Sequence, residues 1–248
     1  MRQFLMFTWV ETKILFRSRE AVFWNFLFPV ALFILYVTVF SGVYPSEIPR
    51  SRTVADNFSK ILAITIMSGG LFSLAISVSV MKEKGILRRY KVTPVRPITI
   101  VSGIVVRQYF FMLIVTAVLY LMALIPYNAD FGAGLLELFI IASLGILVFS
   151  SLGFSIAGIM NTNQGTIGAA NLLFMPMLFL SGAAIPAFLF PKWLKDIASI
   201  FPATHLLNVL QHTLFEGRAL GQDLKSILIL IGFGIAFLVV AAFASRWN

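Results

Sequence analysis

A short connection, Met81–Pro97 (MKEKGILRRYKVTPVRP), carries six cationic side chains between two stretches of almost purely apolar sequence. Lysine and arginine at the end of an apolar span bind anionic lipid headgroups and hold the connection on the cytoplasmic side. The simplest interpretation is therefore an anchor that fixes the orientation of the neighbouring spans.

Three features of this connection favour a docking helix over a simple anchor. Glu83 lies among the cations, and Gly85 permits a sharp change of chain direction. Over Ile86–Val92 apolar residues alternate with cations, so a short helix there presents an apolar face and a basic face. Pro94 and Pro97 then end that helix. An anchor needs no apolar face, whereas a helix that docks against another protein does.

Other arrangements that could carry chemistry are few. No G-x-x-x-x-G-K-(S/T) sequence occurs, so no phosphate-binding loop is predicted on this chain. His205, His212 and Glu216 share one helix face, but without a fourth ligand or an H-E-x-x-H pattern an ordinary polar face is predicted instead of a metal site. Paired carboxylates, H-E-x-x-H and G-x-S-x-G are missing at bilayer depth, which argues against an ion-coupled carrier or an intramembrane enzyme. We therefore expect no catalytic, cofactor-binding or metal-binding residues.

The composition indicates an integral membrane protein. Of the 248 residues 59% are hydrophobic and 12% are charged, with a mean hydropathy of +0.94. The net charge of +9 would suggest nucleic acid in a water-soluble protein, but the cations adjoin apolar spans, where anionic lipid is the nearer partner. The absence of cysteine excludes disulfides and thiolate chemistry.

Six segments are apolar over a length sufficient to cross a bilayer, which takes on the order of 20 helical residues. With the N-terminus inside, twelve Lys and Arg side chains fall on the cytoplasmic side and seven on the other, so both termini are predicted to be cytoplasmic. The chain is expected to form one all-α, multi-pass domain over residues 1–248. The predicted spans are Ala21–Val43, Ile61–Met81, Ile98–Ile125, Leu135–Met160, Ile167–Ala184 and Ser226–Ala244.

Two regions are expected to lie at the membrane surface instead of crossing it. The first twenty residues predict an interfacial helix with a mediocre apolar face. Between the fifth and sixth spans, Pro186, Pro191 and Pro202 mark helix boundaries. The following segment separates a leucine-rich face from a polar one, so short re-entrant or interfacial helices are predicted there.

The cationic connection resembles a motif of ABC-2 type transporter permeases, the membrane subunits of many ATP-driven exporters. Glu83–Tyr90 followed by Thr93–Pro97 is similar to the family's E-(K/R)-x-G-T-L-x-x-L-x-x-T-P-(V/L)-(R/S) stretch, with departures at Ile86 and Tyr90. Further similar elements, which with the six spans extend the resemblance over nearly the whole chain, are Arg17–Arg19 before Phe28–Pro29, Ser181–Gly182 before Pro186, and Phe201–Thr204 before Leu206–Leu207.

The resemblance implies a coupling helix that lies in a cleft of a separate ABC ATPase subunit, on which ATP and Mg²⁺ are bound. It implies two permeases with two ATPases, with a homodimer expected here. The coupling residues it nominates are Glu83, Lys84, Gly85, Ile86, Leu87, Arg88, Arg89, Tyr90, Thr93 and Pro94. The substrate pathway it nominates, between the second and fifth spans of both copies, is Met67, Leu71, Phe72, Asn171, Phe174, Met175 and Phe179.

The function that the resemblance implies is export of a hydrophobic or amphipathic small molecule, such as a drug, antibiotic or lipid, across the cell membrane. An alternative within the same family is export of a lipid-linked polysaccharide. That cargo favours a channel ringed by aromatic and polar residues, whereas this chain has 25 Phe against 4 Trp and 6 Tyr, so a small hydrophobic cargo is preferred.

Overall fold

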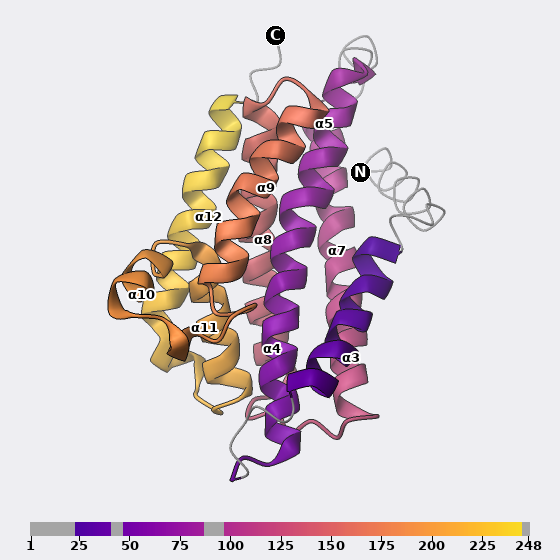
Figure 1. Ribbon diagram of the computed structural model, residues 1–248. Coiled ribbons are helices and arrows are strands. Elements are labelled where there is room, and N and C mark those ends of the chain that lie inside the picture. Colours follow the sequence, from indigo (N-terminus) through magenta and orange to yellow (C-terminus); the bar gives the residue numbers. More distant parts are fainter. Residues whose placement is uncertain (1–22, 41–46, 87–96, 245–248) are drawn as a thin grey trace.

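The computed structural model describes residues 23–40, 47–86 and 97–244, and all of its regular structure there is helical (Figure 1). The long helices run along one axis, and the short ones gather beside one end of the bundle. Along the chain the elements are η1 (Phe23–Leu27), α3 (Phe28–Phe40), α4 (Arg50–Ser68), η2 (Gly69–Leu74), α5 (Ala75–Glu83), α7 (Pro97–Leu124), α8 (Leu135–Ile159), α9 (Asn163–Leu180), η3 (Ala187–Leu189), α10 (Lys192–Ala198), α11 (Pro202–Leu214), η4 (Leu220–Asp223) and α12 (Leu224–Ala244).

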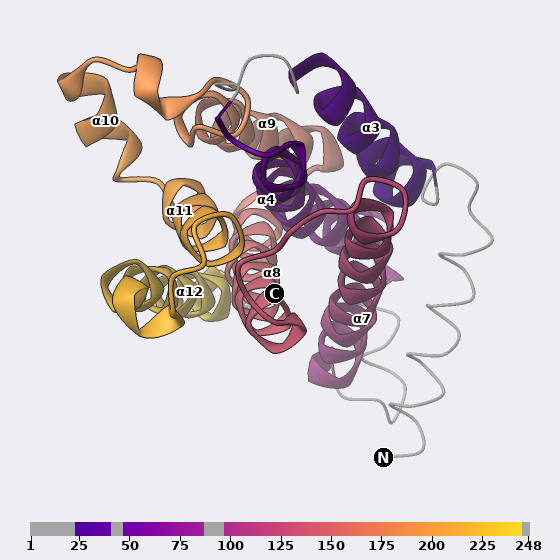
Figure 2. The ribbon, with the colours of Figure 1, turned by 90° about the horizontal axis from the view of Figure 1, so that it is seen from below.

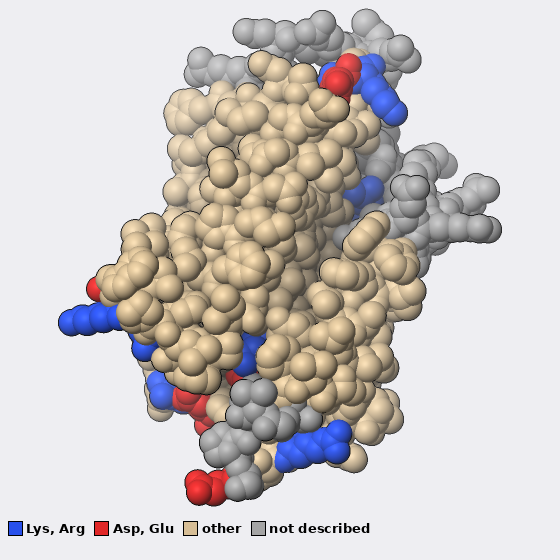
Figure 3. Space-filling model, in the orientation of Figure 1, with Lys and Arg blue, Asp and Glu red and all other residues tan. Residues whose placement is uncertain are grey.

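Four helical stretches of the described chain are long and apolar enough to cross a membrane: Arg50–Glu83, Ser102–Leu124, Leu135–Ile159 and Leu220–Ala244. The prediction of an integral membrane protein agrees with them. On the face shown in Figure 3, charged side chains gather toward the two ends and a broad band with few charges separates them. Such a band is what a hydrocarbon core about 30 Å thick requires.

Within the described residues, the other two predicted spans do not meet the same criteria of length and hydropathy. α3 is apolar but only 13 residues long, and the outer parts of the predicted span, residues 21–22 and 41–43, lie outside the described residues. α9 is 18 residues long, but it begins with the polar residues Asn163 and Gln164 and contains Asn171, so its mean hydropathy is too low to qualify. The six-span arrangement stays a prediction. The expected N-terminal interfacial helix also lies outside the described residues.

The second predicted span begins earlier than expected. Its helix starts at Arg50 instead of Ile61 and continues through η2 to Glu83, 34 residues in all or roughly 50 Å at 1.5 Å per residue. From Thr53 on, the polar residues of its first turns are buried. Asp56 has partners there, since Gln211 Nε2 of α11 donates to Asp56 Oδ1 at 2.5 Å and Lys60 of α4 binds Asp56 at 2.7 Å. The polar residues therefore extend the helix instead of ending it.

The predicted short helices between the last two long ones are present as η3, α10 and α11. Phe201 precedes α11 and Pro202 occupies its first turn, where the missing amide proton costs nothing. The leucine-rich face of α11 is buried, with Leu206, Leu207 and Leu210 at most 1% exposed. α11 therefore packs into the bundle through the face that the sequence predicted.

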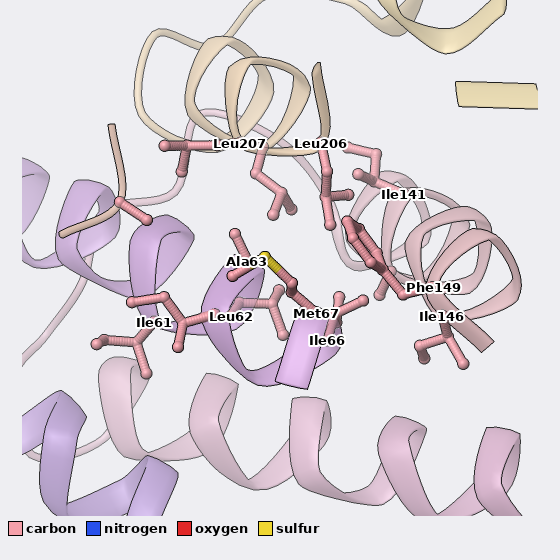
Figure 4. Close-up of a cluster of buried hydrophobic side chains, with 14 of the residues drawn as sticks. Ile61, Leu62, Ala63, Ile66, Met67, Ile141, Ile146, Phe149, Leu206 and Leu207 are labelled. Atoms are coloured by element: carbon pink, nitrogen blue, oxygen red, sulfur yellow. The ribbon is translucent and has the colours of Figure 1, made fainter. Parts of the chain in front are cut away.

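The core lies between α4, α8 and α11. Seen end-on in Figure 2, α4 lies among α3, α8, α9 and α11, with α7 and α12 on opposite sides. In Figure 4, Ile66 and Met67 of α4 meet Leu206 of α11 and Phe149 of α8. α12 packs chiefly on α8, and only 11% of its apolar window is buried, so most of its surface is left for lipid or a partner.

Small residues bring η2 and α8 into backbone contact. A Cβ added at Gly70 would lie 2.6 Å from Phe149 Cβ, and one added at Gly153 would collide with the carbonyl oxygen of Gly70. By contrast, a Cβ added at Gly232 of α12 would meet nothing within 4 Å. The small residues of η2 and α8 thus serve close packing within the bundle, as small residues do between membrane helices.

Replacing Gly153 by alanine should destabilise the fold, because the methyl group forces η2 and α8 apart. We expect the free energy of unfolding to fall by about 1–3 kcal/mol. Gly232→Ala is the matched control, for which helix propensity predicts no loss or a gain of up to about 1 kcal/mol. Thermal unfolding of the detergent-purified protein, followed by loss of the monodisperse chromatographic peak, measures both. Equal shifts in the two variants would contradict the close-contact interpretation.

Candidate functional site

The end of α5 binds the junction of α8 and α9. Lys82 Nζ donates to the carbonyl oxygens of Met160 at 2.8 Å and Gly158 at 3.0 Å. One residue later, Glu83 Oε2 accepts from the backbone N–H of Asn163 at 3.0 Å. A lysine thus lies on the C-terminal end of α8 and a glutamate on the N-terminal end of α9.

Both contacts follow from the electrostatics of helix ends. The last carbonyls of a helix carry partial negative charge and the first amides partial positive charge, and neither has a partner within the helix. Ser79, one turn before Glu83, donates to the Asn163 side chain at 2.8 Å, and Thr162 caps α9 by accepting from Gly165 N at 3.1 Å. The turn Met160–Thr162 is consequently fixed to α5 by side chains of three residues.

This site, which we call the α5 corner (Ser79, Lys82, Glu83 and the α8–α9 turn), stands where the cationic connection begins. α5 ends at Glu83, and Gly85 adopts a left-handed φ of 65°, which glycine tolerates at no steric cost. Lys84 and Gly85 form a turn there, which agrees with the conformational freedom expected of Gly85. Lys82 and Glu83 thus join the start of the connection to the ends of α8 and α9.

Of the predicted coupling residues, the structure describes Glu83, Lys84, Gly85 and Ile86. The carboxylate of Glu83 binds the N-terminus of α9. Lys84 is exposed, and Ile86 is half-buried. The other nominated residues, Leu87, Arg88, Arg89, Tyr90, Thr93 and Pro94, lie outside the described residues.

The predicted pathway residues divide into two groups. Met67 and Leu71 are 2% and 0% exposed and pack into the core of this chain. Phe72 meets Phe174 of α9 with ring centroids 5.2 Å apart, so the structure brings these two predicted residues together.

The remaining pathway residues lie along α9. Met175 and Phe179 are each 47% exposed and present an apolar surface. The Asn171 amide donates to Ile167 O at 3.0 Å, one turn back in its own helix. The open part of the predicted pathway is therefore the α9 surface with Phe72 beside it.

The polar residues His205, His212 and Glu216, in and just after α11, each bind a different partner. His205 Nε2 lies 2.9 Å from Ser199 O, His212 Nδ1 binds Asp223 Oδ1 at 2.7 Å, and Glu216 pairs with Arg218 at 2.7 Å. Their partners lie in different places. Within the described part of the chain, no three His, Cys, Asp or Glu side chains gather closely enough to hold a metal ion.

Two structural features of the long helix were not predicted from the sequence. One is the π-helical turn η2 in the middle of the long helix, where Gln108 of α7 donates to Gly69 O at 3.3 Å and accepts from Ser73 Oγ at 2.9 Å. The other is the role of Lys82, which looked like one more cation of the connection. The glycine pair Gly69–Gly70 was the available signal for the first.

Comparison with known proteins gives three similarities. A sequence model of the family described as ABC-2 type transporter matches residues 2–215. ABC transporter G family member 20 of Dictyostelium discoideum is 29% identical over 166 residues, which are 66% of this chain and 22% of that protein. Nodulation protein J of Rhizobium leguminosarum bv. viciae is 32% identical over 94 residues, which are 38% of this chain and 34% of that protein. The matched part thus spans about a fifth and a third of the length of these relatives.

Replacing Glu83 by glutamine should loosen the first turn of α9, because a neutral amide accepts less strongly from Asn163 N–H and no longer complements the helix dipole. Amide hydrogen exchange in residues 160–167 should accelerate about two- to fivefold. Lys84→Gln, which changes the adjacent exposed charge, should leave it unchanged. Mass spectrometry of the detergent-purified protein measures both, and an unaltered rate in the Glu83 variant would refute the capping role.

Proposed function

This chain belongs to the ABC-2 type transporter family and is a membrane permease of it, and from that premise we propose that it exports a hydrophobic or amphipathic small molecule. The cargo, a drug, antibiotic or lipid, leaves the cytoplasm or the inner leaflet. A separate ABC ATPase subunit, which binds ATP and Mg²⁺, drives the transport. Both termini lie in the cytoplasm.

The observation that best supports coupling to a separate ATPase is the α5 corner. A push on the connection after Gly85 reaches α8 and α9 through charged hydrogen bonds of 2.8–3.0 Å, without passing through a flexible loop. Charge-assisted bonds of this length are short and directional. The α5 corner therefore supports a mechanical function for the cationic connection. A connection that served only as an orientation anchor would not need such contacts.

The pathway that we propose runs between two copies of the chain. Membrane oligomers commonly form about a symmetry axis, and the exposed Met175 and Phe179 of α9 offer an adaptable apolar surface to a second copy or to cargo. Phe72 and Phe174 extend that surface toward α4 and η2. The excess of Phe over Trp and Tyr in the sequence favours small hydrophobic cargo over a lipid-linked polysaccharide, which remains the second candidate.

Transport by reconstituted protein tests the proposal. Liposomes containing the permease with its co-purifying ATPase should move a hydrophobic fluorescent compound only when ATP and Mg²⁺ are supplied. Liposomes with the permease alone should not. Transport at full rate by the permease alone would overturn the proposal, and ATP-driven movement of a lipid-linked glycan but of no small hydrophobic compound would favour the second candidate.

Neutralising Arg88 and Arg89 together should uncouple transport while the protein still inserts into the membrane. Each lost interfacial charge weakens docking, and together we expect roughly a tenfold or greater loss of substrate-stimulated ATPase activity in the reconstituted complex. The matched control is Lys192→Gln with Lys195→Gln, which removes two exposed cations from α10 beside the opposite end of the bundle. If substrate still stimulated the ATPase activity of the Arg88/Arg89 variant, the connection would act only as an orientation anchor.

A disulfide between copies can test the proposed dimer, since the sequence contains no cysteine. Met175→Cys places a single thiol on the exposed face of α9, and mild oxidation in membranes should yield a linked dimer on a non-reducing gel. Leu238→Cys places one on α12, where Leu238 is 56% exposed, and should remain largely monomeric. Linkage through α12 but not through α9 would contradict the proposed dimer, because the two copies would then meet at α12.

A further inference from the structure

A cavity of about 620 Å³ lies beside the first turns of α4, away from the predicted pathway residues. Its walls come from the end of α3, from α4, from α11 and the turn after it, and from the connection that follows α9. Cavities of roughly 300–1,000 Å³ accommodate drug-sized molecules. None of the seven nominated pathway residues lines it.

The walls combine aromatic rings with an excess of carboxylate. Phe40, Phe188 and Phe215 line the cavity from three separate segments. The charged lining consists of the carboxylates of Asp56 and Glu216 and the ammonium of Lys60. His212 also lines the cavity. With His212 neutral, the lining carries two negative charges against one positive charge.

The single cation of the lining is already engaged. Lys60 Nζ lies 2.7 Å from Asp56 Oδ2, with side chains 12% and 6% exposed, and Gln211 holds the other Asp56 oxygen. A buried pair with both members satisfied resists separation, because removing one partner leaves an uncompensated charge. An anionic ligand would therefore find no ready cation here.

Glu216 is held less firmly. Its partner Arg218 lies outside the cavity lining, and the two side chains are 36% and 48% exposed. Exposed pairs of this kind contribute little, so a ligand cation can compete for the carboxylate. The three phenylalanine rings add the apolar and cation–π surface that a large organic cation uses.

We propose that this cavity is a binding site for an amphipathic organic cation, with the positive group near Glu216 and the apolar part among Phe40, Phe188 and Phe215. The site is contained in one chain and needs neither an ATPase nor a second copy. It goes beyond the proposed export function, which the cavity neither requires nor excludes.

Binding of two ions of equal shape and opposite charge tests the proposal. Tetraphenylphosphonium should bind the purified full-length chain in a neutral detergent with 1:1 stoichiometry, measured by equilibrium dialysis of the radiolabelled ion. Glu216→Gln should weaken that binding about three- to tenfold, as expected for one partly exposed charge. Asp196→Asn, which removes an exposed carboxylate of nearby α10 outside the lining, should leave it unchanged.

A second variant separates the cavity from the charge. Ala187 lines the cavity, and Ala187→Trp should obstruct part of it and weaken binding of the cation without altering the charge. Cation binding that is unaffected by both Glu216→Gln and Ala187→Trp would overturn the proposal. The proposal would also be overturned if tetraphenylborate bound more tightly than tetraphenylphosphonium and Ala187→Trp weakened the binding of tetraphenylborate. These measurements omit the ATPase, so their failure would leave the export proposal intact.

Discussion

Every helix that ends inside or against a membrane leaves backbone carbonyls and amides that require partners, and in this permease one helix supplies them for two others. Lys82 closes the end of α8 and Glu83 closes the start of α9, so opposite charges one residue apart satisfy opposite helix dipoles. The remaining architecture depends on this arrangement, because it ties the long helix Arg50–Glu83 to the two helices beside it.

The same long helix carries a buried polar group near its other end. Asp56 and Lys60 bind each other and Gln211 of α11, so the beginning of the helix is tied to α11 as its end is tied to α8 and α9. Between these two attachments most contacts are apolar, as in the cluster of Figure 4, or formed by glycine, as at Gly70 and Gly153, and Gln108 of α7 adds hydrogen bonds to Gly69 and Ser73. Ion pairs and hydrogen bonds thus fix the ends of the long helix, and close packing with the Gln108 hydrogen bonds holds its middle.

Hydropathy predicted well those helices whose sequence is predominantly apolar. α7, α8 and α12 begin and end within two residues of the predicted bounds, because an apolar run with polar flanks has few alternatives in a bilayer. The start of α4 could not be found in this way, since its polar residues are compensated by α11, more than 140 residues later in the chain. Pairing across such a separation leaves no local signal.

The candidate site was predictable to a similar degree. The cationic connection and the turn at Gly85 follow from residue types alone. The role of Lys82 does not, because it depends on where Gly158 and Met160 lie in space.

The π turn at Gly69–Leu74 changes the direction in which the side chains beyond it point. A π turn holds one residue more than the α turn that it replaces, and one residue corresponds to about 100° around a helix axis. The side chains after Leu74 are therefore turned by about a quarter of a revolution relative to an uninterrupted helix. With this rotation, Ser79, Lys82 and Glu83 face the α8–α9 turn. One additional residue in the middle of the helix thus sets which side chains at its end contact α8 and α9.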